Sequence, residues 1–241
     1  MPYSCFTATP PTADAVNVNA DLGEGAGSDE AILEHIDSAS VACGVHAGSA
    51  TIAIATARLC RRRGIEIGAH PGYDDRESFG RREMGLSAAD IEALVSFQVS
   101  ALAAVVPIAY VKPHGALYHR CQHDASVADA VARIAKAHGV GLVGQPGLEL
   151  QAAARRAGIA GHREGFADRL LMPDGSLAPR DQPGAVLDAE AAAAQAVRLA
   201  RSGQFDTICL HGDSPGAADV AARVRRALRE AGVETRPLAA S

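Results

Sequence analysis

The feature that most constrains this chain is a histidine placed, again and again, just after a short apolar run that is typical of a buried strand. Four stretches follow this pattern: Ser40–Gly48, Ile65–Tyr73, Ile108–Tyr118 and Thr207–Asp213. A fifth stretch, Val16–Gly25, ends in the same way with Asp21 and Glu24. Because α/β folds keep their chemistry at the carboxyl ends of parallel strands, we expect these strands to deliver polar groups to one edge of a sheet or barrel.

The sequence alternates strand-like and helix-like segments, without an internal repeat or a Pro/Gly/Ser-rich linker. Strands are predicted near Val16–Ala20, Ala39–Cys43, Glu66–Ala69, Ile108–Val111, Val140–Val143 and Thr207–Leu210. Helices are predicted over Ala31–Ile36, over Thr51–Arg63, from Ser87 onward, and over Ser126–His138, Leu148–Ala157, Asp188–Ser202 and Pro215–Ala231, with a less regular segment over Gly161–Pro183. Strands in series with intervening helices indicate a parallel sheet.

Six or seven such strand–helix units in 241 residues suit a closed β/α barrel. The competing architecture, an open doubly wound sheet, would concentrate its polar residues at one switch point, whereas here they follow nearly every strand. We therefore expect one barrel domain over residues 15–241. Residues 1–14 contain three prolines and no signal-peptide pattern, so we expect them to form a flexible tail.

The composition excludes several classes of partner. A formal net charge of -5 argues against nucleic-acid binding, which needs a basic surface. No apolar run approaches the roughly 20 residues that a membrane span needs. The five cysteines are odd in number, widely spaced and without a CxxC pair, which predicts reduced thiols and a cytoplasmic location.

Two pairs of candidate functional residues lie in the first third of the chain. Asp21 and Glu24 follow the first strand in a glycine-flanked turn, where their carboxylates can converge for metal ligation or acid–base chemistry, or can serve only as helix-cap and loop carboxylates. His46 and His70 have glycines nearby, which let the backbone turn sharply and let a ligand approach. Each imidazole can bind a metal or move protons, although a lone histidine is more often structural.

Two further pairs follow later strands. Lys112 and His114 flank Pro113 at a predicted strand end, where they can polarise a carbonyl group or hold a carboxylate. A buried amine at such a position favours a functional role over a surface one, because burying a charge without a partner is costly. His211 and Asp213 are separated by one glycine, so Asp213 can orient an imidazole, or both side chains can face a pocket.

Arginines and a lid loop supply the candidates for substrate binding. Glu164, Asp168 and Arg169 lie in the motif EGFADR, and Arg180 lies further along the chain. An arginine can hold a substrate carboxylate through two parallel hydrogen bonds, or these charges can form only a local ion-pair network. Tyr73 lies in a long polar loop that can contribute to the pocket or form a solvated lid.

Several common catalytic motifs do not occur in the sequence. There is no GxxxxGK[ST] phosphate loop, no GxGxxG after the first strand, no GxSxG nucleophile elbow and no HExxH zinc helix. The candidate site is therefore one that is assembled from strand ends.

Taken together, seven motifs resemble the LamB/YcsF lactam-utilisation family in order and spacing. They are VNADLGEG, SVACGVHAG, IGAHPGY, FGRREMG, VKPHGALY, EGFADR and CLHGD, and the resemblance extends from Val16 to Val233. It implies a distorted seven-stranded parallel β/α (TIM-like) barrel of the glycoside hydrolase/deacetylase type. It also implies the role of the A subunit of an ATP-dependent 5-oxoprolinase, a hydrolase that cleaves the lactam 5-oxo-L-proline to L-glutamate.

Under this resemblance ATP is a co-substrate that partner subunits B and C handle, in agreement with the missing phosphate loop. The predicted catalytic residues are Asp21, Lys112, His114, His211 and Asp213, and the predicted substrate-binding residues are Glu24, His46, His70, Tyr73, Glu164, Arg169 and Arg180. Asp21 and His211 are the candidates for acid or base. Lys112 and His114 are the candidates for stabilising oxyanion charge.

Two other functions stay open. A metal-dependent carbohydrate deacetylase would use Asp21, His46 and His70 as ligands of a divalent ion, because these residues loosely resemble the Asp-His-His metal set of such barrels. A non-catalytic subunit would bind the lactam and deliver it to a partner. The sequence leaves open whether an ion is bound and whether the chain associates with further copies of itself.

Overall fold

The computed structural model describes residues 15–172, 177–214 and 216–238, so the predicted tail over residues 1–14 lies outside it. Its strands are β1 (Ala15–Leu22), β2 (Ser38–Ala42), β3 (Glu66–His70), β4 (Tyr110–Val111), β5 (Gly141–Gly144), β6 (Gly161–Phe166), β7 (Thr207–His211) and β8 (Glu234–Thr235). Strands β1 to β7 form a closed ring of parallel pairings, because β1 pairs with both β2 and β7. The predicted seven-stranded parallel barrel is confirmed.

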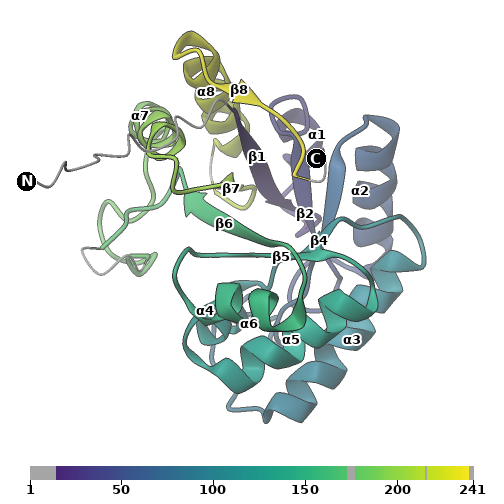
Figure 1. Ribbon diagram of the computed structural model, residues 1–241. Helices are drawn as coiled ribbons and strands as arrows, with labels where there is room; N and C mark the ends of the chain where they lie inside the picture. The colour runs from purple at the N-terminus through teal and green to yellow at the C-terminus, as the bar shows by residue number, and fades with distance from the viewer. Residues whose placement is uncertain (1–14, 173–176, 215, 239–241) are drawn as a thin grey trace, which may run out of the picture.

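Helices surround the barrel (Figure 1). They are α1 (Asp29–Ile32), α2 (Ala50–Arg62), α3 (Ala88–Ala103), α4 (Gly115–His123), α5 (Ala125–Ala137), α6 (Glu149–Ala157), α7 (Ala189–Arg201) and α8 (Ala217–Glu230). Side-chain caps set several of the helix starts: Ser49 accepts the N–H of Ile52, and Asp188 accepts the N–H of Ala191. Among the described residues, no helix is both long and apolar enough to cross a membrane.

Three elements of the structure were not predicted from the sequence, and a fourth, α1 at Asp29–Ile32, lies earlier than the predicted Ala31–Ile36. Helix α4 was not predicted, because its nine residues are too few to show a clear helical period. Strand β6 lies within the segment that was expected to be less regular. Phe166 is the one large apolar side chain among its six residues, and the buried position 164 holds a charged glutamate. The strand therefore lacks the run of apolar residues by which buried strands are predicted. The third element, β8, has only two residues and pairs with the start of β1.

Strand β1 explains why the barrel has a polar interior. Its even-numbered side chains join the apolar core against the helices: Val16, Val18, Ala20 and Leu22. Its odd-numbered side chains alternate to the other face, where Asn19 donates to Thr207 Oγ1 at 2.8 Å and Thr207 donates to Asn17 Oδ1 at 2.7 Å. Polar residues inside the barrel are thus tied to one another by hydrogen bonds.

The strand register brings the candidate residues to one end of the barrel. Asp21 on β1 is level with Ser40 on β2 and with His211 on β7. His70 is the last residue of β3, and Lys112 follows β4 directly. Because the strands are parallel, all their carboxyl ends open at the same face of the barrel.

Candidate active site

The ammonium group of Lys112 lies between two carboxylates at the carboxyl end of the barrel. Its Nζ lies 2.8 Å from Asp21 Oδ1 and 2.7 Å from Glu164 Oε1, and it donates to Asn19 Oδ1 at 3.2 Å. Lys112 is 2% exposed, Asp21 3% and Glu164 1%. Charges buried this deeply are tolerated only when they are paired, so these three groups act as one electrostatic unit.

The charge states of this unit follow from its geometry. Burial alone would raise the pKa of Asp21, but the neighbouring His70 and Lys112 hold that pKa well below its usual value. Burial alone would lower the pKa of Lys112, but the Asp21 carboxylate raises it well above its usual value. Asp21 is therefore ionised and Lys112 protonated at neutral pH.

Hydrogen bonds to the backbone define the tautomers of His70 and His114. His70 Nδ1 lies 2.7 Å from the carbonyl oxygen of Lys112, and His114 Nε2 lies 2.8 Å from that of Phe79. Carbonyl oxygens only accept hydrogen bonds, so these two ring nitrogens carry protons. The other two nitrogens, His70 Nε2 and His114 Nδ1, face each other at 3.0 Å. His70 Nε2 also lies 3.4 Å from Asp21 Oδ2.

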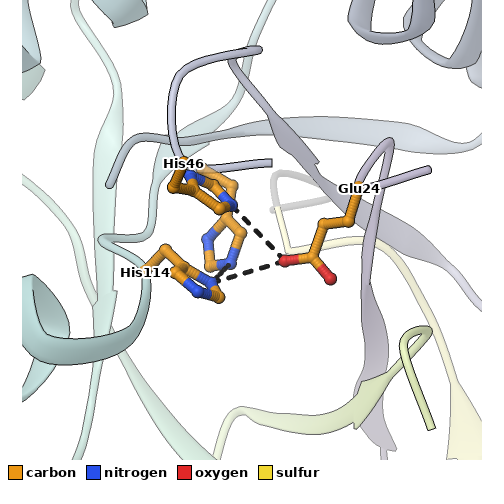
Figure 2. Close-up of side chains that lie close together, drawn as sticks. Glu24, His46 and His114 are labelled. Atoms are coloured by element: carbon orange, nitrogen blue, oxygen red, sulfur yellow. Dashed lines mark hydrogen bonds and ion pairs between the residues drawn. The ribbon is translucent and has the colours of Figure 1, made fainter. Parts of the chain in front are cut away.

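Glu24 and His46 lie beside this histidine pair. Glu24 Oε1 lies 3.4 Å from His46 Nε2 and 3.4 Å from His114 Nδ1 (Figure 2). Within the described structure, neither ring nitrogen of the fully buried His46 forms a hydrogen bond, and neither does Glu24 Oε1. Burial raises the pKa of Glu24 well above its usual value and lowers that of His46 to about 3.

Two glycines of the loop after β3 close over the histidines. A Cβ atom at Gly72 would lie 2.6 Å from His46 Nδ1. A Cβ atom at Gly80, whose φ is 67°, would lie 2.9 Å from His46 Cβ and 3.0 Å from His114 Cδ2. Only residues without a side chain let the loop backbone approach the rings this closely.

His211 faces the same site from β7 and is oriented by Asp168. Asp168 Oδ1 lies 2.9 Å from His211 Nδ1, and Asp168 Oδ2 accepts the backbone N–H of His211 at 2.8 Å. The contact with a carboxylate places a proton on Nδ1, so the lone pair of neutral His211 is on Nε2, which lies 4.0 Å from Asp21 Oδ2. The motif EGFADR predicts no specific role for Asp168. The one signal in the sequence is its place just after a strand end, as for the other site residues.

Asp213 contacts arginines instead of an imidazole. Its carboxylate lies 2.5 Å from Arg81 and 3.1 Å from Arg180. Arg169 is 6% exposed and donates to two backbone oxygens, at 2.6 and 3.3 Å. Tyr73 donates to Glu83 at 3.1 Å and lines neither of the two cavities at this end of the barrel.

A small cavity of about 90 Å³ opens among the inner residues. Its lining includes Asp21, His70, Lys112, His114 and His211. It adjoins a larger cleft of about 1580 Å³, with which it shares Arg81, Tyr118, Phe166, Arg169 and Arg180. The inner cavity therefore carries the polar groups, and the outer cleft gives it a wide mouth lined by arginines.

The structure brings most of the predicted site residues together. One group contains the buried residues Asp21, Glu24, His46, His70, Lys112, His114 and Glu164 and the partly buried His211. Arg169 and Arg180 line both cavities, Asp213 contacts Arg180, and Tyr73 lines neither cavity. The convergence is the outcome expected for parallel strands that share one open face.

Two sets of side chains within the described residues can hold a metal ion, because in each the ligand atoms lie within 4.8 Å of one another. One set is Glu24, His46, His70 and His114, and the other is Asp21, Cys209 and His211. The predicted ligand set of Asp21, His46 and His70 is therefore divided between the two. Imidazole nitrogens with a carboxylate oxygen suit zinc and other first-row divalent ions.

A closed parallel barrel with a polar interior and ionisable groups at its carboxyl face defines the β/α-barrel class that keeps its active site at this face. Within that class, the chain belongs to the LamB/YcsF family, whose model matches residues 16–241. The A subunit of 5-oxoprolinase from Neisseria meningitidis serogroup A is 44% identical over 239 residues, which cover 91% of this chain and 98% of the relative. The protein of the same name from Nocardia farcinica is 44% identical over 242 residues, which cover 90% and 97%.

Solved structures agree with this family assignment. The lactam utilization protein from Thermus thermophilus superposes with a TM-score of 0.83 at 40% identity, covering 92% of this chain and 99% of that chain. A family 4 carbohydrate esterase from Streptomyces lividans superposes with a TM-score of 0.56 at 12% identity, covering 92% of this chain and 91% of that chain, a likeness that concerns the fold alone. The predicted family and fold type are confirmed.

Proposed function

We propose that this chain is the lactam-opening subunit of an ATP-dependent 5-oxoprolinase, which converts 5-oxo-L-proline to L-glutamate. The observation that carries the proposal is the meeting, in one buried cavity, of the ionised Asp21–Lys112 pair with a His211 imidazole oriented by Asp168. The names of relatives that are 44% identical over nearly the whole chain support this choice of substrate.

The chemistry of the substrate explains a need for ATP. A five-membered lactam is unstrained and resists hydrolysis, so its carbonyl group must be activated before water attacks. We assign this activation and the handling of ATP to partner subunits B and C, since the sequence has no phosphate loop. We place the complex in the cytoplasm, where unpaired cysteines such as the four in the described residues stay reduced.

Asp21 and His211 are positioned to direct water onto C5 of the activated lactam. Asp21 Oδ2 and His211 Nε2 are 4.0 Å apart, a spacing at which both can bind one water molecule. As the water oxygen bonds to C5, His211 Nε2 takes up one proton. The C5–N bond then breaks, the ring nitrogen receives that proton from His211, and a second water molecule releases the phosphate that activation had placed on the carbonyl oxygen. Asp168 holds the imidazole in the tautomer that this transfer requires.

Lys112 stabilises, through its own positive charge, the negative charge that develops on the oxygen bonded to C5. Its protons are directed at Asp21, Glu164 and Asn19, so it acts across the cavity and not through a direct hydrogen bond. His114 directs its Nε2 proton at a backbone oxygen and has none to offer the carbonyl oxygen. We therefore assign oxyanion stabilisation to the charge of Lys112.

The substrate carboxylate is best placed at the junction of the two cavities, because Arg180 and Arg169 line both of them. Arg81 and Arg180 share the single carboxylate of Asp213, so a net positive charge remains there. Arg169 has two of its donors engaged with backbone oxygens, and its role is to add charge and shape. Asp213 then serves to position the two arginines that flank it.

The test is 5-oxoproline consumption by the reconstituted complex, with and without ATP and with each subunit omitted in turn. Asp21→Asn and His211→Ala should each lower turnover by about 10²- to 10⁴-fold, the usual contribution of acid–base catalysis. His138→Ala, which changes a histidine on the outside of the barrel, is the matched control. Near-normal turnover by folded Asp21→Asn or His211→Ala would remove that residue from the scheme. Unchanged turnover in both, with lactam still bound, would identify a non-catalytic binding subunit.

A metal-dependent carbohydrate deacetylase is the second candidate. The buried cluster of Glu24, His46, His70 and His114 favours it, because such ligands can hold a divalent ion. Release of acetate from acetylated sugars by the isolated chain, without ATP or partners and abolished by a chelator, would support this function. Turnover of 5-oxoproline that depends on ATP and the partner subunits would support lactam opening instead of deacetylation.

A further inference from the structure

His70 and His114 present two lone pairs to each other. Each ring donates its one neutral-state proton to a backbone oxygen, His70 to Lys112 and His114 to Phe79, at 2.7 and 2.8 Å. When both rings are neutral, the remaining nitrogens, 3.0 Å apart, are both acceptors, and two acceptors at this distance repel unless a proton or a metal cation lies between them. A histidine whose other ring nitrogen donates to a backbone carbonyl is the usual arrangement of a metal ligand.

A carboxylate oxygen is aimed at the same point. Glu24 Oε1 lies 3.4 Å from His114 Nδ1, has no hydrogen-bond partner in the described structure, and belongs to a residue that is 8% exposed. Ligands about 2.0–2.1 Å from a tetrahedral zinc ion are separated from one another by about 3.3 Å. The spacings of 3.0 and 3.4 Å along this set are close to that value.

We propose that His70 Nε2, His114 Nδ1 and Glu24 Oε1 form a binding site for one divalent cation of the zinc or cobalt type. The proposal deepens the proposed function. It rests on that function only in placing the ion beside the cavity where the lactam opens. A ring can coordinate only an ion that lies near its own plane, and the ring of His46 is stacked on that of His114, with planes 5° apart and centroids 4.0 Å apart. His46 therefore packs against the site and does not share an in-plane ion with His114.

The site lies at the wall of the inner cavity. His70 and His114 line that cavity, whereas Glu24 and His46 do not. Asp21 Oδ2 lies 3.4 Å from His70 Nε2, so the negative charge of Asp21 adjoins the proposed cation. Asp21 would then lie between two positive charges, the bound cation on one side and Lys112 on the other.

The experiment uses the isolated full-length chain, treated with a chelator and titrated with Co²⁺ and Zn²⁺, in the absence of lactam, ATP and partners. We expect one Co²⁺ per chain, with the visible absorption bands of a low-symmetry site, displaced by Zn²⁺. His114→Ala and Glu24→Gln should each weaken binding by more than about 100-fold, because losing an outer-shell partner alone costs 10- to 100-fold. Circular dichroism checks that the variants are folded.

The chain supplies a matched control in a second histidine pair. His119 and His123 lie one turn apart on α4 with ring centroids 4.8 Å apart, a spacing that can capture an ion adventitiously at the surface. The double variant His119→Ala/His123→Ala should keep the tight site. Loss of the ion in this variant, but not in folded His114→Ala, would overturn the proposal.

A measurement on the unmodified chain covers variants that fail to fold. Nitrogen NMR of the imidazoles should show His70 protonated on Nδ1 and His114 on Nε2, with added Zn²⁺ shifting the opposite nitrogen of each ring. A proton shared between the two rings, with no uptake of Co²⁺ or Zn²⁺, would overturn the proposal. Ion uptake is measured without lactam, so it is independent of the turnover assay with the reconstituted complex. Ion uptake without lactam turnover would count against the proposed function alone, and turnover without ion uptake would count against the metal site alone.

Discussion

Replacing Lys112 by methionine tests whether the buried ion pair organises the site. Methionine has a similar length and no charge, so the change leaves Asp21 and Glu164 without their shared cation, which lies 2.8 and 2.7 Å from them. Removing one partner of a buried pair typically costs about 3–5 kcal/mol, because the other charge is left uncompensated. In a domain of this size, each kcal/mol lowers Tm by about 2–4 °C, so we expect a fall of about 6–20 °C.

Urea unfolding at several pH values measures this effect. Asp21 has a depressed pKa in the folded wild-type protein, so its stabilising contribution is present above its unfolded pKa and is lost as the pH falls through the folded pKa. In Lys112→Met, burial raises the pKa of Asp21 instead, and protonation relieves the stranded charge. The stability difference between variant and wild type should therefore shrink as the pH falls.

The chain offers one matched control, since Lys136 is its only other lysine and is exposed at the end of α5. Lys136→Met should change the free energy of unfolding by less than about 0.5 kcal/mol. The double variant Lys112→Met/Asp21→Asn should recover part of the loss, because one stranded charge is removed. If Lys112→Met is as stable as Lys136→Met at neutral pH, the reasoning about the buried pair is wrong.

Three other predictions concern the residues around the cavity. Asp168→Asn should lower kcat for lactam opening by about 10²- to 10⁴-fold and shift its pH profile, because His211 loses the carboxylate that orients it; an unchanged profile would remove Asp168 from the scheme. Gly72→Ala should destabilise the protein by about 1–3 kcal/mol in urea unfolding, since its Cβ would press on His46, and a neutral effect would show that the loop can move aside. The pKa of Glu24 is higher in the folded protein than in the unfolded chain. Above the pKa of the unfolded chain, ionisation of Glu24 therefore favours the unfolded state. Glu24→Gln should therefore raise Tm of the chelator-treated protein at pH 8 but not at pH 4, and a lower Tm at pH 8 would refute this.

The barrel, and the face at which its chemistry lies, could be predicted from the amino-acid sequence. Polar residues after successive apolar runs imply strand ends, and parallel strands open at one face, so Asp21, His70 and His211 are expected to meet. This inference needs only the local period of each strand and the parallel order of the chain. It could not extend to α4 or β6, whose sequences lack a clear apolar period.

Which groups pair with which depends on the closed barrel and could not be predicted from local sequence. The fold places Lys112 between Asp21 and Glu164, residues that are 91 and 52 positions away along the chain. It also gives His211 the carboxylate of Asp168, while the nearer Asp213 turns to the arginines at the cavity mouth. Such pairings depend on the register and closure of the whole barrel, because side chains from distant strands touch only after the ring from β1 to β7 has closed.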